Sequence, residues 1–257
     1  MKKQKIPFGT EEWCSKTTNC ISGCSNNCKY CYAKSIAIRF GRKTPETWVN
    51  EEVNFKALNQ KIKKIEGRIM YPSTHDITPT NLEISLQFLK KILSVGNEVL
   101  IVTKPHLEVI KKLCDELVNY KDKIIFRFTI GSIDSEVLKF WEPKAPSYEE
   151  RKQSVIHAFN SGYQTSLSCE PVLDDSVESI VTELQDFVTE TIWIGKMNFL
   201  KARMKINGFK DELSMQKANE LFEMQSDEKI IELVDRLKDN PKIRWKESIK
   251  KVISNNN

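Results

Sequence analysis

The chain has 257 residues, with 40 Lys and Arg against 35 Asp and Glu and a formal net charge of +5. This length is sufficient to bury a substantial core, and no break in composition argues for two separate domains. Because no apolar run could cross a bilayer and the lysine-rich start lacks the apolar core of a signal peptide, we expect a cytoplasmic protein without a membrane segment.

The positive charge is concentrated in the first quarter of the chain. Residues 1–64 carry 13 Lys and Arg against 5 Asp and Glu, whereas the remaining residues carry 27 against 30. A positive field favours an anionic partner, such as a nucleic acid or a phosphorylated small molecule. Lysine-rich helices that simply face solvent would explain the same charge, so both interpretations stay open.

A cysteine-rich loop follows the first predicted strand, which we place at residues 17–21. Four of the seven cysteines fall between Cys20 and Cys31, and Cys24, Cys28 and Cys31 have the spacing C-x3-C-x2-C. A [4Fe-4S] cluster is normally held by four thiolates. A compact loop that supplies three thiolates leaves one iron open to a substrate or cofactor.

Other uses of the cysteines fit their arrangement less well. A structural zinc site usually pairs two C-x2-C knuckles, and the sequence has no second knuckle. A disulfide framework does not suit a chain of this length without a signal peptide. Small buried thiols explain Cys114 and Cys169, which lie in apolar stretches, but not four cysteines in a polar loop. A non-catalytic module that binds iron-sulfur or zinc stays open as an alternative.

Helical and strand-like patterns alternate after this loop. A helix is predicted at residues 33–40, with Gly41 at its end, and another after Asn50. Apolar residues recur at helical spacing in the second helix and are expected in the core: Phe55, Leu58, Ile62 and Ile65. Further strands are predicted at residues 68–71, 99–103, 124–130, 165–169 and 192–194. The helices between them are predicted at residues 81–95, 106–119, 147–161 and 176–188. The helix at residues 147–161 begins with a capping box, Ser147-x-x-Glu150.

This alternation indicates a parallel sheet joined by right-handed crossovers. An open doubly wound sheet and a barrel both fit it. The tail from about residue 198 is predicted to hold helices at residues 211–224 and 226–237 and a last amphipathic segment at residues 243–253. We expect residues 199–257 to form a helical extension that covers the open edge of a core made by residues 1–198, with Trp245 and Ile249 packing inward.

The cysteine motif carries a family resemblance. The string Cys24-x3-Cys28-Lys-Tyr30-Cys31, with an aromatic residue before the last cysteine, resembles that of radical S-adenosylmethionine (SAM) enzymes. The longer string at residues 19–33 is similar to the subgroup that includes spore photoproduct lyase, as is the Trp-Glu-Pro-x2-Pro segment at residues 141–146. The resemblance spans roughly residues 14–198 and implies a partial (β/α)6 barrel of the TIM type, with the cysteine loop after the first strand.

The resemblance also implies the cofactors and the reaction. Cys24, Cys28 and Cys31 would hold a [4Fe-4S] cluster, Cys14 and Cys20 would not, and SAM would bind the fourth iron. Reductive cleavage of SAM would give a 5′-deoxyadenosyl radical that abstracts hydrogen from a substrate. That substrate is a nucleic acid or nucleotide if the protein acts like the lyase, and a peptide, protein or small metabolite in the alternative. A one-electron reductant, such as a flavodoxin or ferredoxin, is expected as a partner of a monomeric enzyme.

In barrels of this kind, functional residues lie at the C-terminal ends of the strands. By resemblance, Lys104 would face the methionine carboxylate of SAM, and Ser132 its methionine or ribose. Glu170 would bond a ribose hydroxyl or the substrate, and Gly195 would allow close approach of the adenosine. The complete set of residues expected to contact SAM is Tyr30, Ser73, Thr74, Lys104, Ser132, Glu170 and Gly195.

Two residues are candidates for a direct part in the chemistry. Where the lyase has a cysteine that donates a hydrogen atom, this sequence has Tyr71 or Pro72, and neither carries a thiol. This difference argues against repair of the spore lesion and leaves Tyr71 as a candidate for radical transfer. His75 beside Asp76 is a candidate proton shuttle, with the alternative that Asp76 only bonds amides of the turn.

Overall fold

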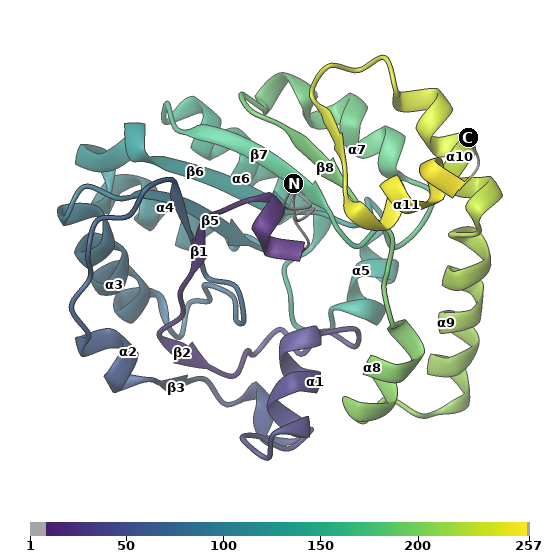
Figure 1. Ribbon diagram of the computed structural model, residues 1–257, viewed down its shortest axis with the longest axis horizontal. Helices are drawn as coiled ribbons and strands as arrows, with labels where there is room; N and C mark the ends of the chain where they lie inside the picture. Colours follow the sequence, from purple (N-terminus) through teal and green to yellow (C-terminus); the bar gives the residue numbers. More distant parts are fainter. Residues whose placement is uncertain (1–8, 256–257) are drawn as a thin grey trace, which may run out of the picture.

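Seven parallel strands form one curled sheet in the computed structural model, which describes residues 9–255. Their spatial order is β1-β4-β5-β6-β7-β8-β9, and every neighbouring pair is parallel. Helices cover the outer side of the curled sheet (Figure 1). The strands are β1 (Lys16–Thr17), β4 (Arg68–Tyr71), β5 (Glu98–Thr103), β6 (Ile124–Thr129), β7 (Gln164–Cys169), β8 (Ile192–Ile194) and β9 (Ile243–Trp245). This arrangement confirms the expected partial TIM-like barrel.

The helices of the barrel connect its strands. They are α1 (Tyr32–Arg39), α2 (Phe55–Asn59), α3 (Leu82–Ser94), α4 (Leu107–Glu116), α5 (Ser135–Trp141), α6 (Tyr148–Asn160) and α7 (Val177–Leu184). Short 3-10 helices lie at η1 (Gly9–Glu12), η2 (Thr47–Val49), η3 (Val118–Lys123) and η4 (Gln185–Phe187). The strands β2 (Ile21–Ser22) and β3 (Glu52–Val53) form a separate antiparallel pair. Among residues 9–255, no helix has both the length and the apolar character needed to span a membrane.

The core lies between the sheet and the helices. Successive residues of a strand face opposite sides of a sheet. On β6, Phe126 packs edge-on against Tyr163, whose hydroxyl donates to the carbonyl of Cys114 in α4 at 2.7 Å. Arg127 therefore faces the concave side, where its guanidinium carbon lies 4.7 Å from the ring centroid of Trp13.

The tail contributes a strand as well as helices. It forms α8 (Leu200–Ile206), α9 (Glu212–Met224), α10 (Asp227–Leu237), β9 and α11 (Glu247–Asn255). The amphipathic segment predicted at residues 243–253 is thus divided, because residues 243–245 pair with the open edge of β8. An unpaired edge offers backbone hydrogen bonds that override a helical pattern in a segment this short. Ile249 is fully buried as expected, and Trp245 is half-buried against the core.

The helix predicted after Asn50 is much shorter than its apolar pattern suggests. Asn54 caps α2 by accepting a hydrogen bond from the amide of Ala57 at 3.0 Å, but the helix ends at Asn59. Beyond it, the amide of Ile65 donates to the side chain of Asn97 at 2.9 Å instead of to a helical carbonyl. Phe55, expected in the core, has 66% of its surface exposed.

We expect Ile249→Ala to lower the free energy of unfolding by about 2–5 kcal/mol, because it leaves a cavity under α11 in the packed core. Urea unfolding followed by circular dichroism measures the change. Phe55→Ala is the matched control and should stay within about 0.5 kcal/mol of the unmodified protein, since its ring faces solvent. An unchanged unfolding transition in Ile249→Ala would mean that the tail does not stabilise the barrel.

Candidate functional site

The three motif cysteines lie in the loop between β2 and α1, which we call the cysteine loop (residues 24–31). Cys24 and Cys28 are buried, Cys31 is half-buried, and none of the three forms a disulfide. Burial raises the pKa of the Cys24 thiol, and nearby negative charge on Asp76, Cys28 and Cys31 raises it further. The three sulfur atoms therefore share one electrostatic environment.

The chemistry of these donors fits an iron-sulfur cluster. Burial raises the pKa of Cys28, but the Lys104 ammonium acts in the opposite direction and favours the thiolate, which is the form that binds iron. The amide of Lys34 donates to the sulfur of Cys31 at 3.3 Å, as amides do to thiolate ligands. Within residues 9–255, no three His, Cys, Asp or Glu side chains are grouped as ligands of a single metal ion. A cluster spreads its ligands over several irons and does not need that grouping.

Cys20 and Cys14 occupy different surroundings. The sulfur of Cys20 is fully buried, 3.1 Å from the hydroxyl of Tyr71. Cys14 donates to the carbonyl of Thr10 in η1 at 3.3 Å. Each of these thiols already has a neighbour outside the cysteine loop.

Asp76 links the cysteine loop to two strand ends. Its buried carboxylate accepts hydrogen bonds from the Asn26 side chain at 3.0 Å and from the amide of Lys104 at 3.0 Å. It also accepts from the amide of Ile77 at 2.9 Å and from the hydroxyl of Thr103. Asp76 thus bonds turn amides, as one of the two sequence interpretations proposed, and it holds the loop after β4 against the end of β5.

His75 lies beside this carboxylate but does not contact it. Its Nδ1 is 3.0 Å from the backbone carbonyl of Asp76, so Nδ1 carries the proton and Nε2 is the acceptor. Nε2 is buried and has no hydrogen-bond partner among the described residues. Burial lowers the pKa of His75 to about 4, so the ring is neutral at physiological pH.

Tyr71 faces the helices. In the sheet register Tyr71 lies level with Phe126, which faces the helix layer, and its fully buried hydroxyl donates to Ser85 of α3 at 2.8 Å. Its ring also packs 5.4 Å from that of Phe88 in α3. The structure therefore does not bring Tyr71 to the concave side with the cysteine loop.

Ser73 and Thr74 are held by a residue that precedes the loop. The side-chain oxygen of Asn19 accepts from the amides of Ser73 and Thr74 at 2.7 and 3.0 Å, and its Nδ2 donates to the Ser73 hydroxyl at 2.8 Å. The hydroxyl of Tyr32, at the start of α1, donates to the Ser73 carbonyl. No sequence pattern assigned Asn19 this role, because a single Asn ahead of a loop is common.

Glu142 contacts the C-terminal part of the cysteine loop. Its carboxylate accepts from the Tyr30 hydroxyl, lies 2.5 Å from Nη2 of Arg151 in α6, and lies 3.7 Å from Nζ of Lys104. The side chains of Glu142 and Arg151 are 1% and 0% exposed. Burial alone would raise the pKa of Glu142, but Arg151 and Lys104 lower it below the usual value, so the carboxylate is charged. The sequence showed this Glu in a family-like segment without giving it a role.

Lys104 lies between the two carboxylates and the thiols. Burial acts to lower its pKa, but Cys28, Glu142 and Asp76 outweigh burial and raise it. Lys104 is therefore a half-buried ammonium group held beside Tyr30, with its Nζ 5.9 Å from that ring centroid. Three expected site residues, Cys28, Tyr30 and Lys104, are brought together here.

Ser132 is less available for a ligand than the sequence suggests. Its hydroxyl donates to the carboxylate of Asp174 and accepts from the amide of Asp134 at 2.8 Å. The residue is fully buried. Ser132 therefore fastens the turn after β6 to the loop after β7.

Glu170 and Gly195 lie together at the ends of β7 and β8. A Cβ atom at Gly195 would lie 3.0 Å from the side chains of Glu170 and Lys246, so a larger residue there would force these side chains to shift. Nζ of Lys246 is 3.6 Å from the Glu170 carboxylate and 2.6 Å from that of Glu12. Burial raises the pKa of Glu170, and Lys246 opposes this shift.

Arg203 of α8 connects this half of the site to the cysteine loop. Burial lowers its pKa, while Cys31, Tyr32 and Glu170 act in the opposite direction. These three groups belong to the cysteine loop, to α1 and to the end of β7, so the guanidinium lies near all three elements. No sequence signal pointed to Arg203, because its helix lies in a tail without a motif.

The amino-acid sequence is similar to that of known proteins. The family model of the radical SAM superfamily matches residues 18–187. An uncharacterized protein of Acidianus two-tailed virus is 26% identical over 196 residues, which cover 68% of this chain and 64% of that protein. An uncharacterized protein of Methanocaldococcus jannaschii is 28% identical over 170 residues, 64% of each chain. The chain thus spans just under two thirds of the length of these relatives.

Comparison with solved structures gives the same fold. Spore photoproduct lyase complexed with dinucleoside spore photoproduct has a TM-score of 0.58 and 18% identity, over 89% of this chain and 75% of the lyase. Streptococcus suis SuiB bound to S-adenosylmethionine has a TM-score of 0.53 and 12% identity, over 90% of this chain and 50% of SuiB. The family model covers well over half of the sequence, and the half-barrel agrees with it. The chain belongs to the radical SAM superfamily.

Proposed function

We propose that the protein is a radical SAM enzyme in which Cys24, Cys28 and Cys31 hold a [4Fe-4S] cluster with one iron open to SAM. The observation that carries this proposal is a loop of three thiols fixed against a half-barrel by two buried carboxylates, Asp76 and Glu142. Neither carboxylate is a ligand, because both are engaged by protein donors. Their role is to hold the loop at the strand ends.

When bound, the cluster and SAM supply one chemistry: one-electron cleavage of a carbon-sulfur bond to give methionine and a 5′-deoxyadenosyl radical, which takes a hydrogen atom from the substrate. The chain positions the cofactors and excludes water. Lys104 suits the methionine carboxylate, because it is a half-buried cation near Cys28. The Tyr30 hydroxyl is held by the carboxylate of Glu142. The Ser73 hydroxyl is half-buried after the end of β4.

The remaining expected residues divide into two groups. Thr74 is exposed beside Ser73, and Glu170 lies with Gly195 at the next strand ends, so these residues can contact SAM or the substrate. His75 offers an unprotonated Nε2 and remains our candidate for proton transfer. For Ser132 and Tyr71, whose hydroxyls are engaged by Asp174 and Ser85, we propose supporting roles.

For the substrate we propose a nucleic acid or nucleotide. The basic first quarter of the chain supports this choice, as does the likeness in fold to a lyase complexed with a dinucleoside. The alternative, a peptide, protein or small metabolite, is favoured by one observation: no thiol stands at Tyr71 or Pro72 to return a hydrogen atom. We further propose a monomeric, cytoplasmic enzyme reduced by a flavodoxin or ferredoxin.

Anaerobic reconstitution should give about four irons per chain and a visible absorbance that bleaches on reduction. Cys24→Ala, Cys28→Ala and Cys31→Ala should each abolish this absorbance, because each removes a thiolate ligand. Cys20→Ala and Cys14→Ala are the matched controls and should retain it. A requirement for Cys20 equal to that for the other three would contradict an open iron.

The same reconstituted protein tests the enzyme assignment. Reduction in the presence of SAM should release 5′-deoxyadenosine and methionine, both measured by chromatography. A cluster that forms, is reduced and never cleaves SAM would leave only a non-catalytic iron-sulfur module.

Lys104→Met should weaken SAM binding at least about tenfold, because it removes a charge-assisted contact to the carboxylate. Equilibrium dialysis with labelled SAM measures the affinity, and iron content and unfolding transition check that the cluster and fold persist. Lys111→Met, on the solvent side of α4, is the control and should bind SAM normally. Unchanged affinity in Lys104→Met would exclude the proposed carboxylate contact.

A further inference from the structure

Three exposed phenylalanines share an unusual arrangement. Phe40, Phe199 and Phe222 have 74%, 74% and 72% of their surface exposed and are the most exposed large hydrophobic side chains of residues 9–255. Each has a cationic group near its ring centroid: Arg42 lies 5.7 Å from Phe40, Arg203 lies 5.8 Å from Phe199, and Lys201 lies 5.7 Å from Phe222. Single exposed apolar side chains are common, but three exposed rings that each lie beside an Arg or Lys are a recurring arrangement.

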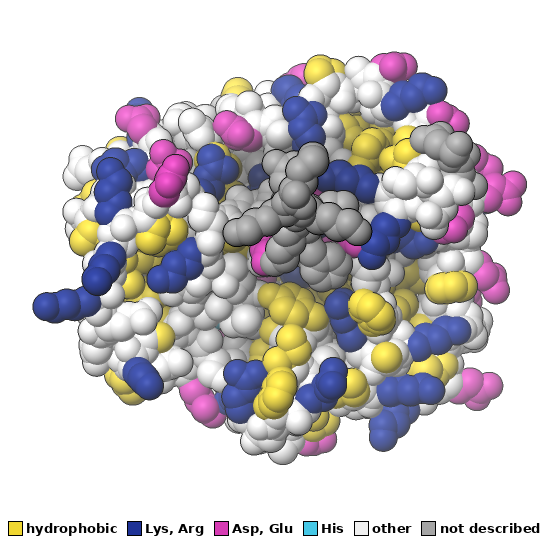
Figure 2. Space-filling view, viewed as in Figure 1, with side chains coloured by type: hydrophobic (Ala, Val, Ile, Leu, Met, Phe, Trp, Pro, Cys, Tyr) yellow, Lys and Arg dark blue, Asp and Glu magenta, His cyan; other side chains and the backbone are white. Residues whose placement is uncertain are grey.

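The three pairs belong to neighbouring helices. Phe40 ends α1, Phe199 precedes α8, and Phe222 lies in α9. Helix α8 packs between α1 and α9, and the three helices lie next to one another on one side of the molecule (Figure 1). Figure 2 shows hydrophobic side chains interleaved with Lys and Arg over the same helices. Cys31 is the N-cap of α1, Phe40 lies at the far end of that helix, and Arg203 of α8 lies near Cys31, so this row of helices adjoins the cysteine loop.

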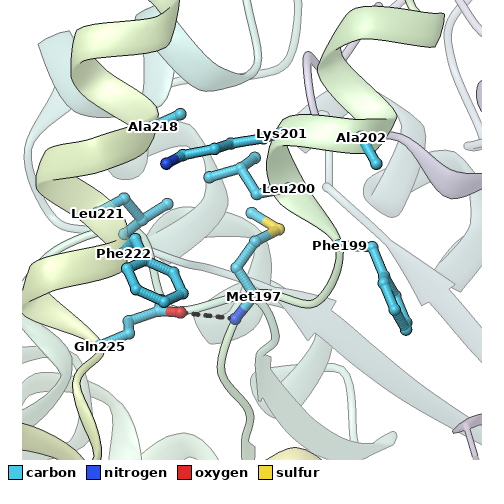
Figure 3. A pocket seen from close by; sticks show the side chains of 9 residues that line it. All are labelled: Met197, Phe199, Leu200, Lys201, Ala202, Ala218, Leu221, Phe222 and Gln225. Carbon is cyan, nitrogen blue, oxygen red and sulfur yellow. Dashed lines mark hydrogen bonds between the residues drawn. The ribbon is translucent and has the colours of Figure 1, made fainter.

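The backbone at Phe199 keeps its ring in solvent. Phe199 has a φ of +56°, a left-handed conformation that bulky residues rarely adopt. The amide of Met197 is fixed by the side chain of Gln225 in α9 at 2.8 Å. In Figure 3, Phe222 lies on one side of Met197 and Phe199 on the other, next to a groove of about 250 Å³ between α8 and α9. The exposed rings of Phe199 and Phe222 thus both lie at the groove between α8 and α9.

The cations of this surface form no salt bridge among the described residues. Arg42, Lys201 and Arg203 have no acid within ion-pair distance, although the Glu170 carboxylate acts on Arg203 from the end of β7. Residues 200–206 carry three Lys and Arg and no acid, and residues 39–43 have the same composition. A partner with regularly spaced negative charge and flat, stackable groups matches this surface.

We propose that α1, α8 and α9 form a track for single-stranded nucleic acid, with bases stacked on the three phenylalanines and phosphates paired with the three cations. A duplex hides its bases and would use only the cations, and an acidic protein would have no need of the exposed rings. The proposal rests on the proposed function, since the track would lead a nucleic-acid strand to the cysteine loop. It adds that the substrate is single-stranded.

Fluorescence anisotropy with labelled single strands of DNA and RNA, about 15 nucleotides long, tests the track on the reconstituted protein. Both strands should bind more tightly than the duplex of the same sequence. Affinity should fall about 20-fold between about 50 and 200 mM salt, as expected for three phosphate contacts. Phe40→Ala, Phe199→Ala and Phe222→Ala should each weaken binding about tenfold.

The control is Phe55→Ala, since Phe55 is similarly exposed on α2, away from the track, and has no cation among the described residues near its ring. It should bind as the unmodified protein does. Preference for the duplex, or affinity unchanged in the triple phenylalanine variant, would overturn the proposal. So would a triple variant that binds nucleic acid normally but accepts electrons slowly from flavodoxin, which would make this surface a reductant site.

Release of 5′-deoxyadenosine without substrate, measured on the same preparations, separates this proposal from the proposed function. Normal SAM cleavage with no binding of single strands removes only the track. Binding of single strands that depends on the phenylalanines, with no SAM cleavage, supports the track and removes only the enzyme assignment.

Discussion

The buried carboxylate of Glu142 is the contact on which the rest of the site depends. Removing a charge from water costs several kcal/mol, and the cost is offset only when the partners have good geometry. Arg151 from α6 and the Tyr30 hydroxyl supply that geometry, and Lys104 from β5 adds a second cation. If any of these partners moved, a buried charge would be left unpaired, so the cysteine loop is constrained to one position against the strands.

Asp76 makes the constraint two-sided. Asp76 accepts hydrogen bonds from the side chain of Asn26, which precedes Cys28 in the loop as Tyr30 follows it, and from the backbone amide of Lys104. Two acids from separate segments therefore fix the loop and the same lysine. These contacts give the thiols a fixed place against the strands. They also fix Lys104, the cation that acts on Cys28, from two sides.

The sequence predicted what depends on local pattern. Strands and crossover helices, and the capping of α6 by Ser147, follow from periodicity and cap chemistry. The sequence-based prediction was wrong where a contact distant in sequence determines the structure. Residues 243–245 form a strand because they pair with the free edge of β8. The side of the sheet that Tyr71 faces could not be predicted either, because only the sheet register determines it. Glu142 looked like part of a motif, and its importance appeared only with Arg151 beside it.

Lys246, near the C-terminal end of the described chain, contacts η1 at the N-terminal end and the end of β7. Its ammonium reaches Glu12 at 2.6 Å, the carbonyl of Gly9 at 2.8 Å and Glu170 at 3.6 Å. The same short segment, residues 243–246, therefore pairs with the edge of β8 and ties η1 to the end of β7. A change that displaces this segment would expose the edge of β8 and release η1 at the same time.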